Sequence, residues 1–335
     1  MTASLPRHLS LRAAALLAMF ALVTSVFTFA AGPAPLTWKQ VKPATAFPAR
    51  ASFATAYDPV SKKVIAFGGV DVNGTLYNET WAFDGQTWQL LKTRVAPSAR
   101  FGAAMAFDRQ IKKIVLFGGS SGFGRISDTW LFDGATSKWK QARLKNPPPG
   151  ASNAMLFTDP VNGHADMFGG RRTQFYSRDT LQWNGTEWIL LNPTNSPYPR
   201  SGGINVLDPV HKNVVVFGGI SDNWITQNTW TWDGTDWTQQ NPTTQPDTLY
   251  FTAGGFDPIL KQVVVFSGGS GAVDQEATWS WNGSDWAPLA PASSPTAREQ
   301  FGTVWDPASH QFLIFGGVNF GSGEVFGDTW KLTGK

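Results

Sequence analysis

Short apolar runs recur along the chain at nearly constant spacing, and six of them end in a Gly-Gly pair. Most of these runs are rich in Val, Ile and Phe and only four or five residues long, which favours strands over helices. An Asp, usually followed by Pro, precedes each run and indicates a turn into it. The chain therefore contains six copies of one unit. The Gly-Gly pairs end at Gly69, Gly119, Gly170, Gly219, Gly269 and Gly317, and the preceding acids are Asp58, Asp108, Asp159, Asp208, Asp257 and Asp306.

The second half of each unit carries tryptophan at regular places. A loop and then Thr-Trp follow the Gly-Gly pair, except in the third unit, which has Thr180-Leu181. In the first five units an Asp-Gly or Asn-Gly turn comes next and leads to a further Trp, a strong signal for a hairpin. Four antiparallel strands in about 50 residues make one blade of a β-propeller. We predict an all-β, six-bladed propeller with blades at about 50–91, 100–142, 150–191, 200–240, 250–289 and 298–333.

The sixth unit lacks a fourth strand, because the chain ends soon after its Thr-Trp pair, in DTWKLTGK. Trp38 lies 50 residues before Trp88, in register with the fourth-strand tryptophans of the other units. We therefore predict that residues 36–41, LTWKQV, form the outer strand of the last blade, close the ring and cover a sheet edge that would otherwise be free. The alternative is an unrelated N-terminal edge strand.

The N-terminal segment has a different pattern from the repeats. Arg7 and Arg12 precede an apolar stretch that ends in small residues near Ala31, as in a secretory signal peptide. A retained membrane anchor is the alternative. We predict a signal peptide at 1–31, a propeller at 36–335, and export to the periplasm or the extracellular space.

Charge and cysteine content narrow the classes of partner and chemistry. The formal net charge is +3, and loss of Arg7 and Arg12 would leave 3 − 2 = +1, without a basic run that would suggest nucleic acid. The chain has no Cys, so we expect no disulfide, no thiolate metal site and no thiol catalysis. We expect a monomer that has no membrane contact beyond the signal segment.

The Gly-Gly pair, the downstream Trp and the period of about 50 residues resemble kelch repeats, from about Leu36 to the end of the chain. The resemblance, to propellers like the central domain of galactose oxidase, implies that the loops between strands two and three and between strands four and one share one face. It also implies that these loops build the binding site and that the first strands line a central channel. Kelch propellers serve unrelated roles. We expect a non-catalytic binding module for a protein segment or a glycan on the long-loop face.

The candidate binding residues lie in these loops and at the starts of the first strands. By the resemblance, four arginines would circle one mouth of the channel and could grip an anion; a structural tie between loops is the alternative. Blade 3 offers a basic-aromatic loop, one loop Trp matches no repeated position, and blades 5 and 6 offer acids; solvated loops and simple packing are the alternatives. These residues are Arg50, Arg100, Arg200 and Arg298, then Arg171, Arg172, Phe175 and Tyr176, then Trp224, then Asp274, Glu276 and Glu324.

Asp166 is a further candidate, because it falls in an apolar strand where other units have Ile65 or Val115. A carboxylate at such a position must be paired, protonated or functional. Arg172 and His164 are near in sequence and are candidate partners.

We predict no catalytic residue, no metal site and no cofactor, since the histidines are scattered among separate turns. The copper chemistry of galactose oxidase requires a Cys-linked Tyr, which a chain without Cys cannot form. The alternative function is a sugar mutarotase-like enzyme, similar to the exported kelch propellers that act as bacterial sialic-acid mutarotases. Such an enzyme would use the acidic and Arg residues at the channel mouth.

Overall fold

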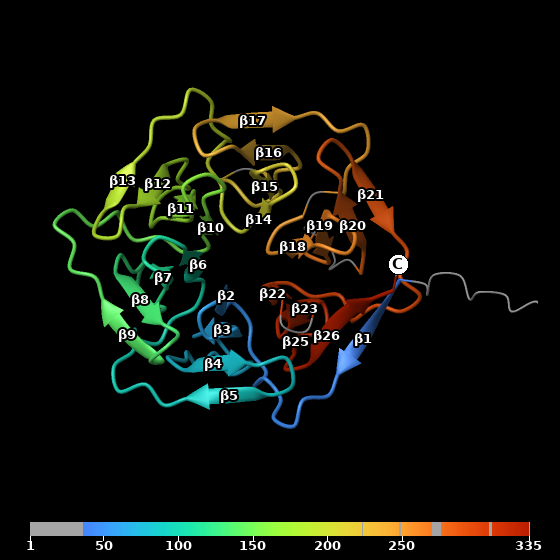
Figure 1. The fold of residues 1–335 in the computed structure, drawn as a ribbon, viewed down its shortest axis with the longest axis horizontal. Helices are drawn as coiled ribbons and strands as arrows, with labels where there is room; N and C mark the ends of the chain where they lie inside the picture. Colours follow the sequence, from blue (N-terminus) through green and yellow to red (C-terminus); the bar gives the residue numbers. More distant parts are fainter. Residues whose placement is uncertain (1–35, 223, 248, 270–275, 308–309, 335) are drawn as a thin grey trace, which may run out of the picture. The chain divides into compact units, whose positions relative to one another are not determined.

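The structure is a computed structural model, which describes residues 36–222, 224–247, 249–269, 276–307 and 310–334. All of these belong to one compact unit, Ala34–Lys335. Within this unit, six antiparallel four-stranded sheets follow one another around a ring (Figure 1). The described residues contain no helix, and hence none long and apolar enough to cross a membrane. The predicted six-bladed all-β propeller is confirmed.

Each blade is one sheet, and its strands follow chain order from the innermost to the outermost, except in blade 6. Blade 1 consists of β2 (Ala54–Asp58), β3 (Lys63–Phe67), β4 (Thr80–Phe83) and β5 (Trp88–Leu91). Blade 2 consists of β6 (Ala104–Asp108), β7 (Lys113–Phe117), β8 (Thr129–Asp133) and β9 (Lys138–Gln141). Blade 3 consists of β10 (Met155–Thr158), β11 (Ala165–Phe168), β12 (Thr180–Trp183) and β13 (Trp188–Leu190).

The second half of the ring repeats this pattern. Blade 4 consists of β14 (Ile204–Asp208), β15 (Asn213–Phe217), β16 (Thr229–Trp232) and β17 (Trp237–Gln240). Blade 5 consists of β18 (Ala253–Asp257), β19 (Gln262–Phe266), β20 (Thr278–Trp281) and β21 (Trp286–Leu289). Blade 6 consists of β22 (Gly302–Asp306), β23 (Gln311–Phe315), β26 (Thr329–Thr333) and β1 (Thr37–Val41), with a small hairpin of β24 (Val318–Asn319) and β25 (Glu324–Val325) in its loop.

The N-terminal strand β1 closes the ring. It pairs antiparallel with β26 at the C-terminal end of the chain, with Trp38 opposite Leu332, and the two strands lie side by side in Figure 1. Ser293, which follows blade 5, accepts a hydrogen bond from the backbone N–H of Trp38 and donates one from its hydroxyl to the Trp38 carbonyl. The predicted outer strand of the last blade is therefore confirmed, and the blade that joins the two ends of the chain has four strands like the others.

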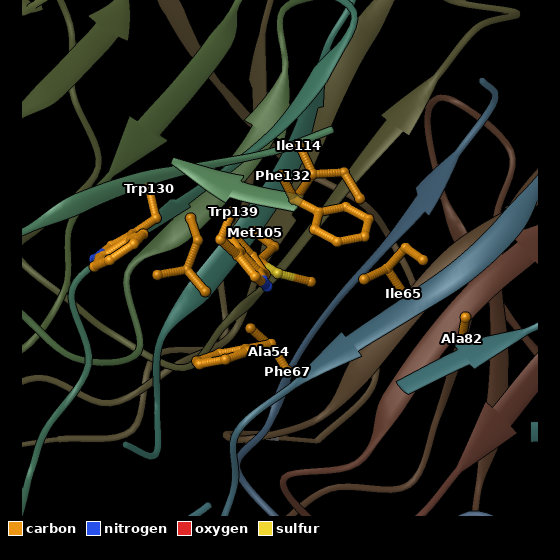
Figure 2. Close-up of a cluster of buried hydrophobic side chains, with 10 residues drawn as sticks. Ala54, Ile65, Phe67, Ala82, Met105, Ile114, Trp130, Phe132 and Trp139 are labelled. Carbon is orange, nitrogen blue, oxygen red and sulfur yellow. The ribbon is translucent and has the colours of Figure 1, made fainter. Parts of the chain in front are cut away.

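The hydrophobic core lies between the blades, because a blade is apolar on both faces. Successive residues of β3 point to opposite neighbours: Val64 packs toward blade 6 and Ile65 toward blade 2. Burial on both faces explains why the second strands are apolar at nearly every position instead of alternating. Figure 2 shows one of six such clusters, in which Ile65 and Phe67 of blade 1 face Met105 and Trp139 of blade 2.

Each fourth-strand Trp ties its blade to the preceding one. Its ring is buried, and its Nε1–H donates to the hydroxyl of the Thr that opens the preceding blade's third strand, at 2.8–3.2 Å. Blade 3 keeps this Thr although Leu181 replaces the Trp beside it, so the tie between blades depends on the threonine of the Thr-Trp pair. The pairs are Trp38–Thr278, Trp88–Thr329, Trp139–Thr80, Trp188–Thr129, Trp237–Thr180 and Trp286–Thr229.

Thr180→Val should lower the free energy of unfolding by about 1–2 kcal/mol, because the valine keeps the volume and leaves the buried Trp237 Nε1–H without an acceptor. Urea unfolding measures this loss. Trp237→Phe and the double variant complete a mutant cycle, in which we expect a coupling of about 1 kcal/mol. Additive losses in the cycle would contradict the proposed contribution of this hydrogen bond.

Candidate functional site

One face of the propeller collects the loops between second and third strands, here called the 2–3 loops, and the segments that lead into the first strands. In every blade a β-bridge joins the two, as between Ala51 and Val70 in blade 1. Both glycines of the first Gly-Gly pair have positive φ, and a Cβ on Gly68 would lie 2.7 Å from the carbonyl oxygen of Arg100 in the next blade. Glycine is needed there because the loop crosses so close to its neighbour. We call this surface the loop face.

A closed ring of hydrogen bonds surrounds the channel on the loop face. One residue per blade, just before the first strand, has positive φ and donates its backbone N–H to the carbonyl of its counterpart in the preceding blade, at 2.7–3.0 Å. Four of the six are not glycine, and such strained backbone persists only where the surrounding structure enforces it. The channel mouth is therefore a fixed rim. Its members are Ser52, Gly102, Asn153, Gly202, Phe251 and Gln300.

The central channel is a cavity of about 540 Å³ lined by the first strands of all six blades, as the kelch resemblance implied. The rim residues lie at the loop-face end. Its lining also includes Tyr57, Phe107, Phe256 and Trp305, each the last residue but one of its first strand and so nearer the opposite end. The cavity combines polar rim groups with aromatic rings, which suits a ligand that is partly apolar.

The four repeated arginines are buried and are not among the residues that line the channel. Each donates from Nη1 to the carbonyl of the first glycine in its own blade's Gly-Gly pair, at 3.0–3.1 Å. Three of them also pair with an acid just before the third strand. These contacts are those expected if the arginines tie the first strand to the 2–3 loop, which was the structural alternative for them. Ligand binding by the four arginines stays a prediction. The ion pairs are Arg50–Glu79, Arg100–Asp128 and Arg298–Asp328.

Arg200 differs from the other three. Asn228 occupies the place of the acid in blade 4, and Arg200 donates to Thr226 Oγ1 and to the carbonyl of Tyr198. Burial lowers the pKa of its guanidinium to about 10. Arg200 is still cationic at neutral pH, so blade 4 holds a buried positive charge that has no ion pair in the described part of the chain.

The basic-aromatic loop of blade 3 is built from stacked pairs. The guanidinium carbon of Arg171 lies 4.5 Å from the ring centre of Tyr176, and that of Arg172 lies 5.4 Å from the ring centre of the exposed Phe175. Arg172 also pairs with Asp179. The structure thus brings together all four residues that the sequence proposed in this loop.

Residues of blades 2 and 4 interact with this basic-aromatic loop. Burial and the charge of Arg171 lower the pKa of Arg125 in blade 2. On the other side, Asp222 lies 3.4 Å from Arg171, and Trp224 is 51% exposed with its ring edge-on to Tyr198 at 6.2 Å. Trp224 occupies the loop position that the sequence proposed for it.

The structure describes two of the three acidic candidate residues. Glu276 and Glu324 are exposed on the loops of blades 5 and 6, and Asp274 lies outside the described residues. Within the described ranges, no group of three or more His, Cys, Asp or Glu side chains is arranged to hold a metal ion. The convergence of carboxylates that sugar chemistry requires stays untested for these three residues.

Asp166 is buried at the interface between blades 3 and 4, away from the loops. Its Oδ1 accepts from Gln182 Nε2 at 2.9 Å, and its Oδ2 accepts from Trp232 Nε1 at 3.1 Å. The same indole N–H lies 3.1 Å from Asp159 Oδ2. Burial and the adjacent Asp159 carboxylate raise the pKa of Asp166 to about 8, so Asp166 is mostly protonated at neutral pH.

The partners that the sequence suggested for Asp166 are wrong. Arg172 pairs with Asp179, and His164 Nδ1 lies 3.1 Å from Asp108 Oδ2. Asp166 instead bonds to a residue opposite it on β12 and to a tryptophan of the next blade. Whether Asp166 has a function beyond these hydrogen bonds stays a prediction.

Comparison with known proteins agrees with this repeat geometry. A family model described as the KLHDC2/KLHL20/DRC7 Kelch-repeats domain matches residues 25–189. The chain belongs to the kelch-repeat β-propellers. A solved structure titled "Structure of YjhT" superposes with a TM-score of 0.67 at 17% identity, covering 87% of this chain and 99% of that one, which shows a shared fold. No curated protein sequence matches the chain.

This kelch propeller exposes five large apolar side chains on its loop face within the described residues, and sequence reasoning identified only two of them, Phe175 and Trp224. In five of the six 2–3 loops, one such residue stands three to five positions after the Gly-Gly pair; in blade 5 that place lies outside the described residues. Their common offset from the Gly-Gly pairs is the signal that could have found them. We call them the apolar crown: Val72, Phe123, Phe175, Trp224 and Phe320.

Proposed function

We propose that this kelch propeller is an exported binding protein that captures a segment of another protein on its loop face. The apolar crown is the observation that carries the proposal. Large apolar side chains gathered on one face of a soluble protein and interspersed with charges are typical of protein-binding surfaces. The export part of the proposal rests on the sequence of residues 1–31.

A protein segment suits the loop face better than a small glycan does. The crown residues lie on the 2–3 loops of five blades, so a ligand must reach across several blades to cover them. A sugar ring stacks on one or two aromatic rings. The stacked pairs Arg171–Tyr176 and Arg172–Phe175 add cationic groups beside the apolar ones, and such aromatic-arginine combinations dominate the energetics of protein interfaces.

Replacement of Phe175 and Trp224 by serine should weaken the binding of captured peptides at least tenfold, which corresponds to about 1.4 kcal/mol. Both side chains are about half exposed, so we expect melting to stay nearly unchanged. Peptides selected from a displayed library against the wild-type protein provide the ligands, and their affinities for the two proteins provide the measurement. Val161→Ser is the matched control, because Val161 is 74% exposed in a turn at the opposite end of blade 3.

Two outcomes would contradict the proposal. In the first, the Val161→Ser control weakens binding as much as the crown variant does. In the second, the library yields no peptide while a glycan array or a panel of sugars yields a ligand or a turnover. The second outcome would favour the carbohydrate alternative.

A further inference from the structure

Three blades contain the same triad of a buried arginine, a partly exposed acid and a tryptophan. In blade 2, Arg100 Nη2 donates to Asp128 Oδ2 at 2.9 Å, and Trp130 Nε1 donates to the same oxygen at 2.7 Å. Two donors, one of them charged, thus converge on one carboxylate. The triads are Arg50–Glu79–Trp81, Arg100–Asp128–Trp130 and Arg298–Asp328–Trp330.

Blade 4 keeps both donors of the triad and lacks the acid. Arg200 and Trp230 occupy the arginine and tryptophan positions, and Asn228 stands at the acid position. Three atoms that take part in the triad elsewhere are buried without a hydrogen bond here: Arg200 Nη2, Trp230 Nε1 and Asn228 Oδ1. Thus, at the position where the other three blades have the carboxylate of the triad, blade 4 has three polar atoms without a hydrogen-bond partner.

The other blades do not share this imbalance. Blades 3 and 5 have Gly150 and Tyr250 in place of the arginine, so no buried guanidinium needs an acid there. Arg200 is 0% exposed, and a buried charge without a counter-charge costs several kcal/mol of folding free energy. An anion supplied from outside would remove that cost.

The acid position of the triad can be reached from solvent. The side chains of Glu79, Asp128 and Asp328 are 33%, 21% and 20% exposed, while their arginines are at most 3% exposed. Asn228 is likewise half-buried, and no hydrogen bond holds its Oδ1 in place. A ligand carboxylate can therefore reach the two buried donors once the Asn228 side chain rotates outward to make room for it.

The triad also shows which ionisation state the position favours. Burial acts to raise the pKa of Glu79, yet the hydrogen bonds from Trp81 and Arg50 outweigh it, and the pKa lies below its usual value. The donor pair thus selects an ionised carboxylate. The geometry matches the charge-assisted recognition for which arginine is suited.

We propose that blade 4 carries a carboxylate-binding subsite in which Arg200 Nη2 and Trp230 Nε1 hold the anion at the place of the missing acid. The ligand is either a small organic acid or an acidic side chain of a partner protein. Arg200 also donates to the carbonyl of Tyr198, whose ring contacts Trp224, so the subsite adjoins the exposed aromatic pair of the loop face. The subsite does not depend on the proposed capture of a protein segment.

Acetate should shift the indole N–H resonance of Trp230 in protein labelled with ¹⁵N at its tryptophans, titrated against chloride at constant ionic strength. Trp230→Phe assigns the resonance, because it removes that one signal. We expect a saturable shift at Trp230 and none at Trp130, which already donates to Asp128. The melting temperature should rise by about 3 °C when acetate is tenfold above its dissociation constant.

Two substitutions form a matched pair. Asn228→Asp should rebuild the triad, raise the melting temperature without acetate, and make the Trp230 signal unresponsive. Asp128→Asn should do the reverse in blade 2, lowering stability and making Trp130 respond to acetate. If Asp128→Asn does not fold, the Asn228→Asp and Trp230→Phe proteins still decide the matter.

The source of the carboxylate is tested with two capped hexapeptides that differ only in a single Asp or Asn. Binding of the Asp peptide at least tenfold tighter than acetate, with loss of this gain for Asn, assigns the subsite to a partner's side chain. Equal affinities for the Asp peptide and acetate assign it to free organic acids. An unmoved Trp230 signal, a uniform shift of all indole signals, or an Asn228→Asp protein that titrates like the wild type would overturn the subsite.

Discussion

A protein that begins at residue 42, without the closing strand β1, should unfold at a temperature at least about 10 °C lower than the propeller that begins at Leu36. Trp38 is 1% exposed, its ring centre lies 5.3 Å from that of Phe266 and 5.9 Å from that of Phe312, and its Nε1–H bonds to Thr278. Loss of a buried Trp alone costs about 3–5 kcal/mol. Removal of five paired residues adds to that loss.

The deletion should also change the oligomeric state, because it leaves β26 as an unpaired edge. Exposed edges pair with other chains, so dimers or larger species are expected at micromolar concentration. Circular dichroism on heating and light scattering after gel filtration measure the two effects. Starting the chain at Leu36 is the control, since that protein keeps β1. Unchanged melting together with a monomer would refute ring closure as the role of this strand.

Asp166→Asn should remove a pH dependence of stability that the wild type shows between about pH 5 and pH 7.5. The pKa of Asp166 in the folded protein is about 8, above its ordinary value of 3.8, so the folded state binds a proton that the unfolded state has released. Stability is therefore greatest below the unfolded pKa and falls as pH rises toward the folded pKa, by about 1.4 kcal/mol per pH unit. The wild type should lose about 3 kcal/mol over that range relative to the variant.

The asparagine is suited to this test because its amide supplies an acceptor for Gln182 Nε2 and a donor toward Asp159 at every pH. Its Nδ2 cannot accept from Trp232 Nε1 as Asp166 Oδ2 does, but that indole N–H keeps Asp159 Oδ2 as an acceptor, so the resulting loss of stability is independent of pH. Urea unfolding at several pH values gives the difference between the two proteins. Asp84→Asn is the matched control, since Asp84 is exposed in a turn where blade 5 already has Asn282. If the difference between wild type and Asp166→Asn were independent of pH, Asp166 would not hold a proton in the folded state.

The repeat determined most of the fold from the sequence. The apolar second strands, the Asp-Pro turns and the Asn-Gly turns are local signals, and their agreement in six units left one architecture. Even a contact between the two ends of the chain followed, because Trp38 stands in register with the fourth-strand tryptophans. The pairing of β1 with β26 was thus predictable although hundreds of residues separate the strands.

The candidate site was predictable only in its location. Trp224 stood out because it matches no repeated position, and Phe175 because it lies in the basic-aromatic segment RRTQFYSR. Val72, Phe123 and Phe320 were missed because their offset from the Gly-Gly pairs varies between three and four positions, and nothing local distinguishes Tyr198 from residues that pack inward. Exposure depends on the course of a whole loop, and loops do not follow the periodic rules of strands.

Tertiary structure alone decided how charges are matched across blades. The sequence showed Asp166 as an anomaly and suggested neighbours along the chain, whereas its partners come from β12 and from Trp232 of the next blade. In the same way, the arginine series was visible in the sequence, but the absence of an acid beside Arg200 appears only when Asn228 is placed against it. The physical reason is the separation along the chain of the residues that interact. A strand's periodicity is set by residues next to one another, while the pairing of a buried charge is set by whichever segments the fold brings within hydrogen-bond distance.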